Sequence, residues 1–195
     1  ILIDLGSLTI QFQFFLKVAP KIQSMASELL VQYSRQSDSD YRLNQLTIDM
    51  FNYARPGDIN ICAAISNKEI KKKLYYLGDL DPKNTLDLKH KSWLKTTFNI
   101  SNKDIKIRYV KTLRLEKILD KHNFKEIDFM NIDIEGHEIE VLKSINFRKT
   151  KVNVICVEVL DYDKRKKKQL LNFFKKNNYF LKKRVSINYI FQNKS

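Results

Sequence analysis

The chain has 195 residues, of which 43% are hydrophobic, and it carries a formal net charge of +14 at pH 7. This length and apolar content suffice for one domain with a substantial core and argue against a disordered protein. With only 4 Gly and 3 Pro there are few places for a flexible linker, so we expect a single domain over residues 1–195. No run approaches the roughly 18 apolar residues of a membrane-spanning helix, and we expect no transmembrane segment and a cytoplasmic location. The start at Ile1 instead of Met leaves an N-terminal truncation open.

The positive charge is spread along the whole chain, with lysine runs at residues 71–73 and 166–168. The second run opens a predicted helix with Leu170, Leu171 and Phe174 on its buried face, so we interpret these lysines as a solvated helix face. The alternative is weak attraction to acidic glycans, phospholipid or nucleic acid. Because no nucleic-acid-binding motif accompanies the charge, we expect no specific nucleic-acid partner.

Strand-like and helix-like patterns alternate along the chain. Strands are predicted, in chain order, at residues 1–5, 59–65, 105–109, 127–134, 152–160, 179–181 and 187–191. Helices are predicted at residues 11–33 with an interruption at Pro20, and at 46–53, 113–121, 139–145 and 164–177. This order predicts an α/β fold with a mostly parallel sheet that is covered on both faces and ends in an antiparallel C-terminal hairpin.

Three local details accompany these elements. Ile105, Ile107 and Tyr109 alternate like the buried face of a half-buried strand. Thr112 is the expected N-cap of the helix that follows. A polar region around Trp93 separates this strand from the preceding one.

The most informative segment is residues 127–144, I-D-F-M-N-I-D-I-E-G-H-E-I-E-V-L-K-S, in which an apolar strand passes through an acidic turn into an amphipathic helix. Gly136 lies where the chain changes direction and can adopt a backbone conformation closed to other residues. Ligands bind at the carboxyl ends of strands in open α/β sheets. The polar side chains that would gather at this edge are Asp133, Glu135, His137 and Glu138.

This segment resembles the hallmark of the FkbM-type methyltransferase family, I-D-x-x-x-x-D-x-E-G-x-E-x-x-x-L-K, followed by an apolar strand that ends in an acid. The matching residues are Ile127, Asp128, Asp133, Glu135, Gly136, Glu138, Leu142, Lys143 and, in the next strand, Glu158. Further similar stretches are residues 3–6, 52–66, 84–85 and 111–120. The resemblance implies a Rossmann-like class I methyltransferase fold, S-adenosylmethionine as cofactor, and methyl transfer to a hydroxyl of a sugar, a glycan or a polyketide-like small molecule.

Methyl transfer to a hydroxyl is an in-line displacement, in which carboxylates can position the acceptor and take its proton. We therefore predict Asp133 and Glu135 as catalytic residues, with His137 as a further candidate base because its usual pKa is near neutral. The structural alternative is that Glu138 only caps its helix and that Asp133 only bonds to backbone amides at the turn. His90 and His122 lie in lysine-rich surroundings and are expected at the surface.

The resemblance also assigns the cofactor site. It implies that Asp4 and Gly6 lie beside the amino-acid end of S-adenosylmethionine, that Ser66 contributes to the same site, and that Asp40 is the nearest candidate to hold the ribose hydroxyls. We expect the strand of Asp4 to adjoin the strand of Asp133. We predict no bound metal.

Residues 8–43 depart from the pattern of the family. Ile10 stands where the family has Gly or Pro, and Arg42 stands where it has the ribose-binding acid. One alternative is therefore a family member that kept the fold and lost the cofactor site. A second alternative is a metal-dependent glycosyltransferase, since D-I-E resembles an Asp-x-Asp motif, although such motifs are not normally followed by a G-x-E that opens a helix.

Overall fold

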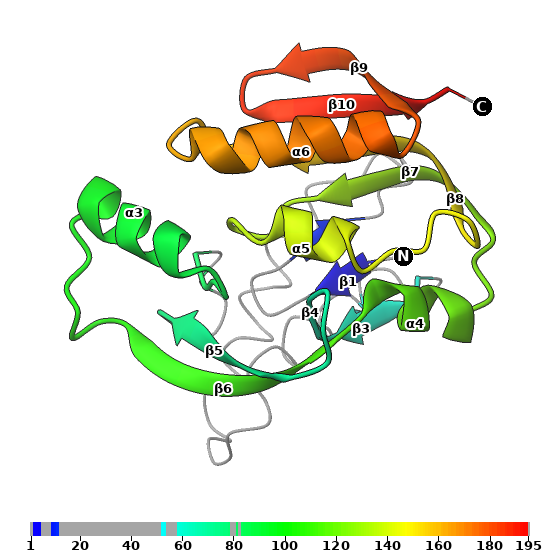
Figure 1. The fold of residues 1–195 in the computed structure, drawn as a ribbon. Coiled ribbons are helices and arrows are strands. Elements are labelled where there is room, and N and C mark those ends of the chain that lie inside the picture. The colour runs from blue at the N-terminus through cyan, green and yellow to red at the C-terminus, as the bar shows by residue number, and fades with distance from the viewer. Residues whose placement is uncertain are drawn as a thin grey trace.

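The computed structural model describes residues 2–4, 9–11, 52–53, 58–78, 81 and 83–194, with the backbone alone for 2–4, 9–11, 60 and 62. Its strands are β1 (Leu2–Asp4), β2 (Thr9–Gln11), β3 (Asn60–Cys62), β4 (Ala64–Ile65), β5 (Lys71–Tyr76), β6 (Lys106–Leu113), β7 (Glu126–Ile132), β8 (Lys151–Glu158), β9 (Tyr179–Val185) and β10 (Asn188–Asn193). Its helices are α3 (Leu88–Phe98), α4 (Leu115–Lys121), α5 (Glu138–Leu142) and α6 (Lys164–Lys176), shown in Figure 1. None of these helices is both long and apolar enough to cross a membrane. The helix predicted at 11–33 and most of the one at 46–53 lie outside the described residues.

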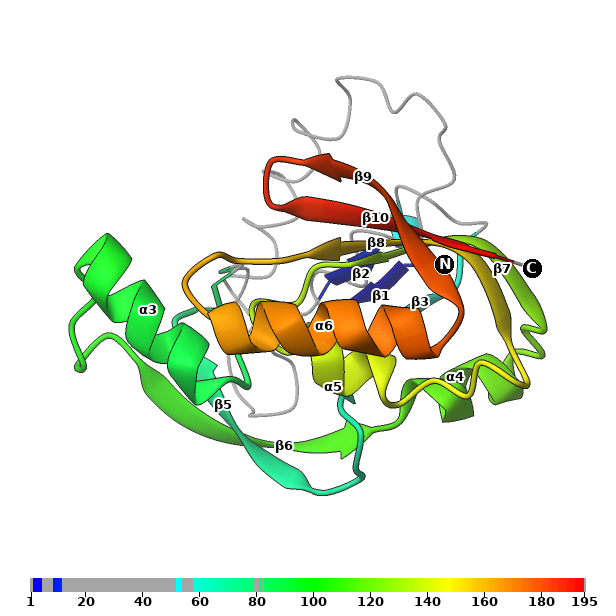
Figure 2. The same ribbon diagram turned by 45° about the horizontal axis from the view of Figure 1, so that its top comes forward.

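The largest sheet has the strand order β7-β8-β10-β9. β7 runs parallel to β8, and β10 runs antiparallel to both β8 and β9, so the predicted C-terminal hairpin is confirmed. α5 and α6 lie over one face of this sheet (Figures 1 and 2). Phe174 of α6 stacks on Phe191 of β10 with ring centroids 3.7 Å apart, which fixes the helix against the sheet.

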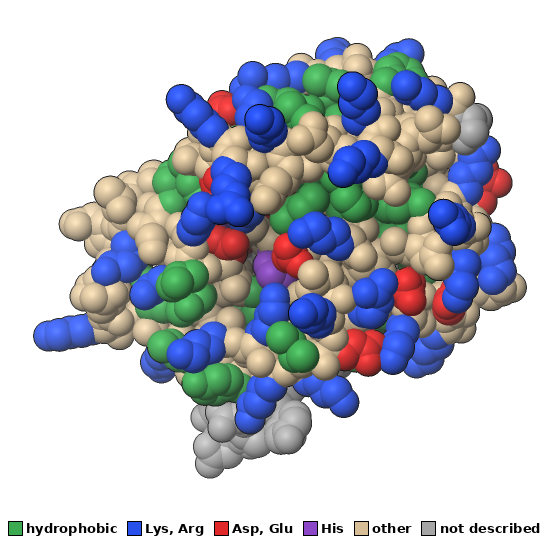
Figure 3. Space-filling view, in the orientation of Figure 1, with side chains coloured by type: hydrophobic (Ala, Val, Ile, Leu, Met, Phe, Trp, Pro, Cys, Tyr) green, Lys and Arg blue, Asp and Glu red, His purple; other side chains and the backbone are tan. Residues whose placement is uncertain are grey.

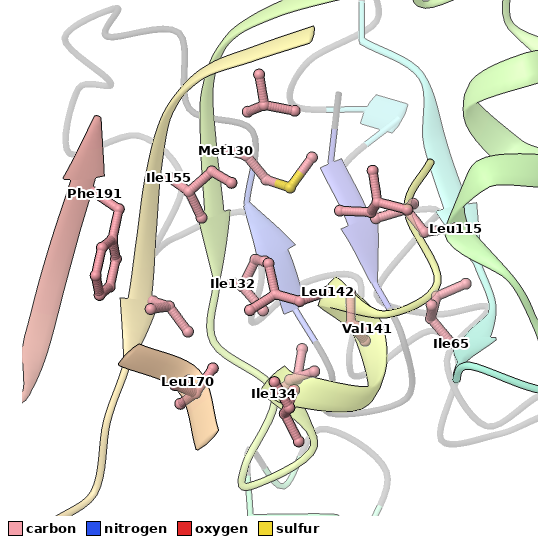
Figure 4. Close-up of a cluster of buried hydrophobic side chains, with 14 of the residues drawn as sticks. Ile65, Leu115, Met130, Ile132, Ile134, Val141, Leu142, Ile155, Leu170 and Phe191 are labelled. Atoms are coloured by element: carbon pink, nitrogen blue, oxygen red, sulfur yellow. The ribbon is translucent and has the colours of Figure 1, made fainter. Parts of the chain in front are cut away.

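The core fills the space between this sheet and its helices. Met130 and Ile132 of β7 are fully buried, and Figure 4 shows Ile132 beside Leu142 of α5. The residues that recur at three-residue steps, Ile139, Leu142 and Ile145, are all buried. The apolar strand and the amphipathic helix predicted on either side of the acidic turn are therefore confirmed.

Two smaller sheets have the strand orders β2-β1-β3 and β4-β6-β5. Each combines one parallel and one antiparallel strand pair. The fold is α/β, but the expected mostly parallel, Rossmann-like sheet is not confirmed, because antiparallel pairs predominate among the described strands. Parallel pairing requires a crossover across a sheet face. α3 instead sits at the end of the β5–β6 ribbon (Figure 1), so the chain returns along β6 antiparallel to β5.

The alternation expected in β6 is present, but its faces are the reverse of the prediction. Ile107 and Tyr109 are 55% and 58% exposed, whereas Arg108 and Val110 are less exposed. The guanidinium of Arg108 lies 3.7 Å from the ring centroid of Tyr76 on the adjoining strand β5. An alternating pattern shows that a strand has two faces, but the neighbouring elements decide which face is covered.

Thr112 is not the N-cap of α4. It belongs to β6, and its hydroxyl lies within hydrogen-bond distance of the carbonyl groups of Lys68 and Ile70. The residue at the N-cap of α4 is Arg114, which makes no side-chain capping bond. The hydroxyl of Ser144, which follows α5, accepts the amide hydrogen of Leu115 at 3.0 Å. The cap is thus provided by another part of the fold.

The sequence pattern indicates neither β5 nor α3. β5 begins with three lysines, and only its Leu74 and Tyr76 are buried. α3 buries only His90 and Leu94. Elements with so few buried positions produce no clear periodicity.

Candidate active site

The acidic turn between β7 and α5 has an unusual backbone. Glu135 has φ +52° and Gly136 has φ +94°, so two successive residues adopt left-handed conformations. A Cβ atom at position 136 would lie 2.8 Å from Cβ of His90, closer than such atoms pack. The prediction that this position needs the conformational freedom of glycine is confirmed, and the close approach of His90 adds a second reason.

His90 is the most important residue that the sequence did not reveal. Its side chain is fully buried, so the expectation that it lies at the surface is wrong. The imidazole, on α3, places Nε2 at 2.7 Å from Oε2 of Glu135 and Nδ1 at 2.9 Å from the hydroxyl of Tyr162. His90 therefore joins the predicted catalytic turn to the loop after β8. The only local signal for it is Asp87, three residues earlier, which accepts the His90 amide hydrogen as helix N-cap.

Two consecutive polar residues, Asn84 and Thr85, support the same turn. The hydroxyl of Thr85 donates to the carbonyl of Glu135 at 2.7 Å. The adjacent Asn84 accepts from the amide of Leu77 and donates to the carbonyl of Gly78. Asn84 and Thr85 are both buried, so they fix the loop that supports the turn. The hydrogen bond from Thr85 to Glu135 gives a structural reason for residues 84–85 and the acidic turn to occur in the same chain.

Asp133 directly follows β7 and Glu158 is the last residue of the adjacent parallel strand β8, so the two lie at the same edge of the sheet. Burial raises the pKa of Glu158 to about 8, and the carboxylates of Asp133, Glu135 and Glu138 add to the rise. The Glu158 Oε2 atom is buried without a hydrogen-bond partner among the described residues. The Asp133 side chain still reaches solvent, although partial burial and the neighbouring Glu135 raise its pKa. Four acids therefore share a site that would favour a cationic ligand.

Glu138 is buried at the first position of α5. Its Oε1 atom accepts the amide hydrogen of Gly136 at 2.7 Å, so it stabilises the turn. Burial raises its pKa to about 6. This geometry supports the structural interpretation of Glu138.

His137 faces away from these contacts. Its Nε2 atom lies 3.2 Å from the hydroxyl oxygen of Ser66 and 3.3 Å from the ammonium nitrogen of Lys72. Burial lowers the pKa of His137 to about 3, and the positive charges of Lys72 and Lys166 lower it further. The imidazole is therefore neutral at pH 7. A predicted catalytic residue, His137, is thus in direct contact with a predicted cofactor residue, Ser66, which is itself fully buried.

Lys166 is mostly buried, so the interpretation of residues 166–168 as a solvated helix face is wrong for this residue. Its side chain is 16% exposed and forms an ion pair with Asp87 at 3.1 Å. The same ammonium group donates to the carbonyl oxygen of Gly136. Lys166 therefore ties α6 to both the N-cap of α3 and the acidic turn.

An aromatic wall borders the buried His90. The rings of Trp93 and Tyr162 stack with centroids 5.0 Å apart and an interplanar angle of 13°. The ring of His90 lies 5.2 Å from that of Trp93. This stack holds the loop after β8 against α3 and limits the orientations open to the imidazole.

The predicted cofactor residues are less completely placed. Asp4 ends β1, which pairs with β2 and β3, and it is β2 that lies beside β7. The expectation that the strand of Asp4 adjoins the strand of Asp133 is therefore wrong. Gly6 and Asp40 lie outside the described residues. In the described part of the chain, no group of three His, Cys, Asp or Glu residues has a geometry that could hold a metal ion.

Comparison with known proteins gives one match. Residues 31–181 match the profile of the family described as the Methyltransferase FkbM domain. Neither the curated proteins nor the solved structures include a significant match to the chain. The matched range contains the acidic turn, β8, α3 and α6.

Proposed function

The chain belongs to the FkbM methyltransferase domain family, and from this premise we propose that it is an S-adenosylmethionine-dependent O-methyltransferase. The proposed acceptor is a hydroxyl of a sugar, a glycan or another small molecule. The observation that carries the proposal is the acidic edge where Asp133 follows β7, Glu158 ends the adjacent parallel strand β8 and His90 holds Glu135. This is the kind of strand edge at which α/β enzymes bind their ligands.

S-adenosylmethionine supplies an electrophilic methyl group on a positively charged sulfur. The acidic edge fits a ligand of this charge, because the unpartnered Oε2 of Glu158 is held beside other carboxylates. A nearby cation would favour the ionised form of Glu158 and lower its pKa. Glu158 is therefore our candidate to face the cationic part of the cofactor. Asp4, Gly6 and Asp40 remain proposals for its other parts, and Ser66 would act indirectly, through His137.

The proposed catalytic roles follow from exposure and hydrogen bonding. Asp133 reaches solvent and can accept the proton of an acceptor hydroxyl. Burial raises the pKa of the Tyr162 phenol, so its hydroxyl stays protonated where it lies 2.9 Å from Nδ1 of His90. The other ring nitrogen, Nε2, lies 2.7 Å from Oε2 of Glu135. This arrangement fixes the orientation of the Glu135 carboxylate, which can position the acceptor.

The test separates chemistry from cofactor binding. We expect Asp133→Asn and Glu135→Gln each to lower turnover by roughly 100-fold or more, as for a lost general base, while the affinity for S-adenosylhomocysteine changes less than tenfold. Turnover is measured with S-adenosylmethionine and a panel of hydroxylated acceptors, and affinity by calorimetry. Glu126→Gln, at the exposed start of the same strand, is the matched control.

Three outcomes would contradict the proposal in whole or in part. Unchanged turnover in both variants would make the two acids structural. Absence of S-adenosylhomocysteine binding at millimolar ligand would favour a family member that has lost its cofactor site, for which the divergent residues 8–43 are the specific indication. If the unmodified protein binds S-adenosylhomocysteine and the folded Asp133→Asn and Glu135→Gln variants do not, the two acids belong to the cofactor site.

A further inference from the structure

A hollow of about 380 Å³ lies where α3, α5 and α6 begin. We call it the three-helix hollow. It borders the acidic turn through Gly136 and His137, but neither Asp133 nor Glu135 lines it. Figure 3 shows a histidine between acidic and basic side chains near the centre of this face. The cations that line the hollow are Lys72, Lys89, Arg165 and Lys166.

Two of these cations are neutralised within the fold. Lys166 pairs with Asp87 at 3.1 Å, and Lys89 pairs with Asp163 at 3.1 Å. Each of these aspartates also caps a helix, since Asp87 accepts from the amide of His90 and Asp163 from that of Lys166. The charges of both pairs are therefore used by the structure itself.

The charged side chains of the hollow outside these two ion pairs are more positive than negative. The third carboxylate of the hollow, Glu140, pairs with Lys143 at 3.1 Å, and Lys143 lies outside the hollow. Among the described residues, Arg165 forms no ion pair. The ammonium of Lys72 has His137 Nε2 as its hydrogen-bond partner at 3.3 Å. Arg165 and Lys72 are thus the two cations free to bind a ligand.

The surroundings of Lys72 also favour the binding of an anion. Its direct partner is a neutral imidazole, so the contact supplies no opposite charge. Burial lowers the pKa of Lys72, although the more distant carboxylates of Glu140 and Asp87 oppose this effect. A partly buried ammonium without a directly paired carboxylate is costly unless an anion completes its environment.

We propose that the three-helix hollow binds a small ligand through a carboxylate or phosphate group, with Lys72 and Arg165 as the main contacts. The first turns of α3 and α6 also border the hollow, where Asp87 and Asp163 accept from their amides. Gln169 and Glu140, which also line the hollow, provide polar groups for hydroxyls. The volume suits a monosaccharide with one acidic group. This site is separate from the acidic edge and does not depend on the proposed methyl transfer.

The experiment uses three probes on the full chain: glucuronic acid, inorganic phosphate and glucose, titrated at low ionic strength and followed by NMR or calorimetry. We expect saturable binding of at least one anionic probe and at least tenfold weaker binding of glucose. Arg165→Gln and Lys72→Gln should each weaken binding of that anion by about tenfold. Lys168→Gln, an exposed lysine of the same helix outside the hollow, is the matched control and should leave it unchanged.

The outcomes are distinct. Binding of glucuronic acid alone identifies a carboxylate ligand, and binding of phosphate identifies a phosphate-bearing one. The proposal is overturned if glucose binds as well as the anions, if no anionic probe binds, or if Arg165→Gln has no effect. Because Arg165 is exposed, its replacement tests the site without affecting the fold. S-adenosylhomocysteine binding, measured in parallel, tests the proposed function separately.

Discussion

At the scale of single residues, the contact between Gly136 and His90 defines the geometry of the turn. Gly136→Ala would place a side chain at φ +94° and 2.8 Å from Cβ of His90. We expect it to lower the free energy of unfolding by about 2 kcal/mol or more, since a left-handed backbone alone costs about 1–2 kcal/mol for such a residue. Urea denaturation measures the change.

Gly78→Ala is the matched control. A Cβ atom there meets nothing closer than 3.8 Å, so the expected change is within about 0.5 kcal/mol. His90→Gly removes the Cβ atom that lies 2.8 Å away, so the double variant His90→Gly with Gly136→Ala should lose less stability than the sum of the two single variants. Equal stability of Gly136→Ala and the unmodified protein would show that the turn can relax around His90.

Glu158 makes the stability depend on pH. Its usual pKa of 4.5 is raised to about 8 in the folded protein, mainly by burial. Between these values the unfolded chain has released the proton while the folded chain retains it, so stability falls as pH rises. Glu158→Gln should therefore stabilise the protein at pH 8 by about 1 kcal/mol or more, and have little effect near pH 4.5.

Urea denaturation at several pH values checks this prediction, with Glu126→Gln as an exposed control. If the curves of free energy against pH for Glu158→Gln and the unmodified protein run parallel, the carboxyl of Glu158 is solvated in the folded state. S-adenosylhomocysteine should weaken the effect if its ammonium group lies beside Glu158.

At the scale of elements, Lys166 and Lys168 show that one lysine run can have two roles. Lys166 joins α6 to α3 and the acidic turn, whereas Lys168 is exposed. We expect Lys166→Gln to lower the free energy of unfolding by about 1–2 kcal/mol, because it leaves Asp87 without its ion pair. Lys168→Gln should change it by less than about 0.5 kcal/mol.

Thermal and urea unfolding of the two variants under the same conditions measure the difference. Similar small effects for both would restore the interpretation of a uniformly solvated helix face. A second measurement is hydrogen exchange of the first turn of α3, which should become faster only in Lys166→Gln, since Asp87 caps that helix.

At the scale of the whole molecule, the net charge of +14 is distributed over many elements. We expect weak, salt-sensitive retention on heparin, as for a dispersed positive surface. Single replacements by Gln at Lys73, Lys121 and Lys176, which are exposed on three different elements, should each shift elution by a similar small amount. A single variant that accounts for most of the retention would instead indicate a localised polyanion site.

The sequence by itself was enough to predict those features that depend on residues close together along the chain. The buried positions of β7 and α5, the turn at Gly136 and the C-terminal hairpin follow from local periodicity and backbone preference. The grouping of acids at the end of β7 follows from the same pattern, because consecutive residues of a turn cannot be far apart.

Only the tertiary structure decided the features that depend on residues distant in the chain. Burial of His90 beside Glu135, the covered face of β6, the cap of α4 by Ser144 and the ion pair of Lys166 each require a partner at least 29 positions away. The antiparallel pairing of β5 and β6 depends on where α3 sits. Sequence patterns report which side chains can be buried or charged, whereas the packing of other elements determines which of them meet.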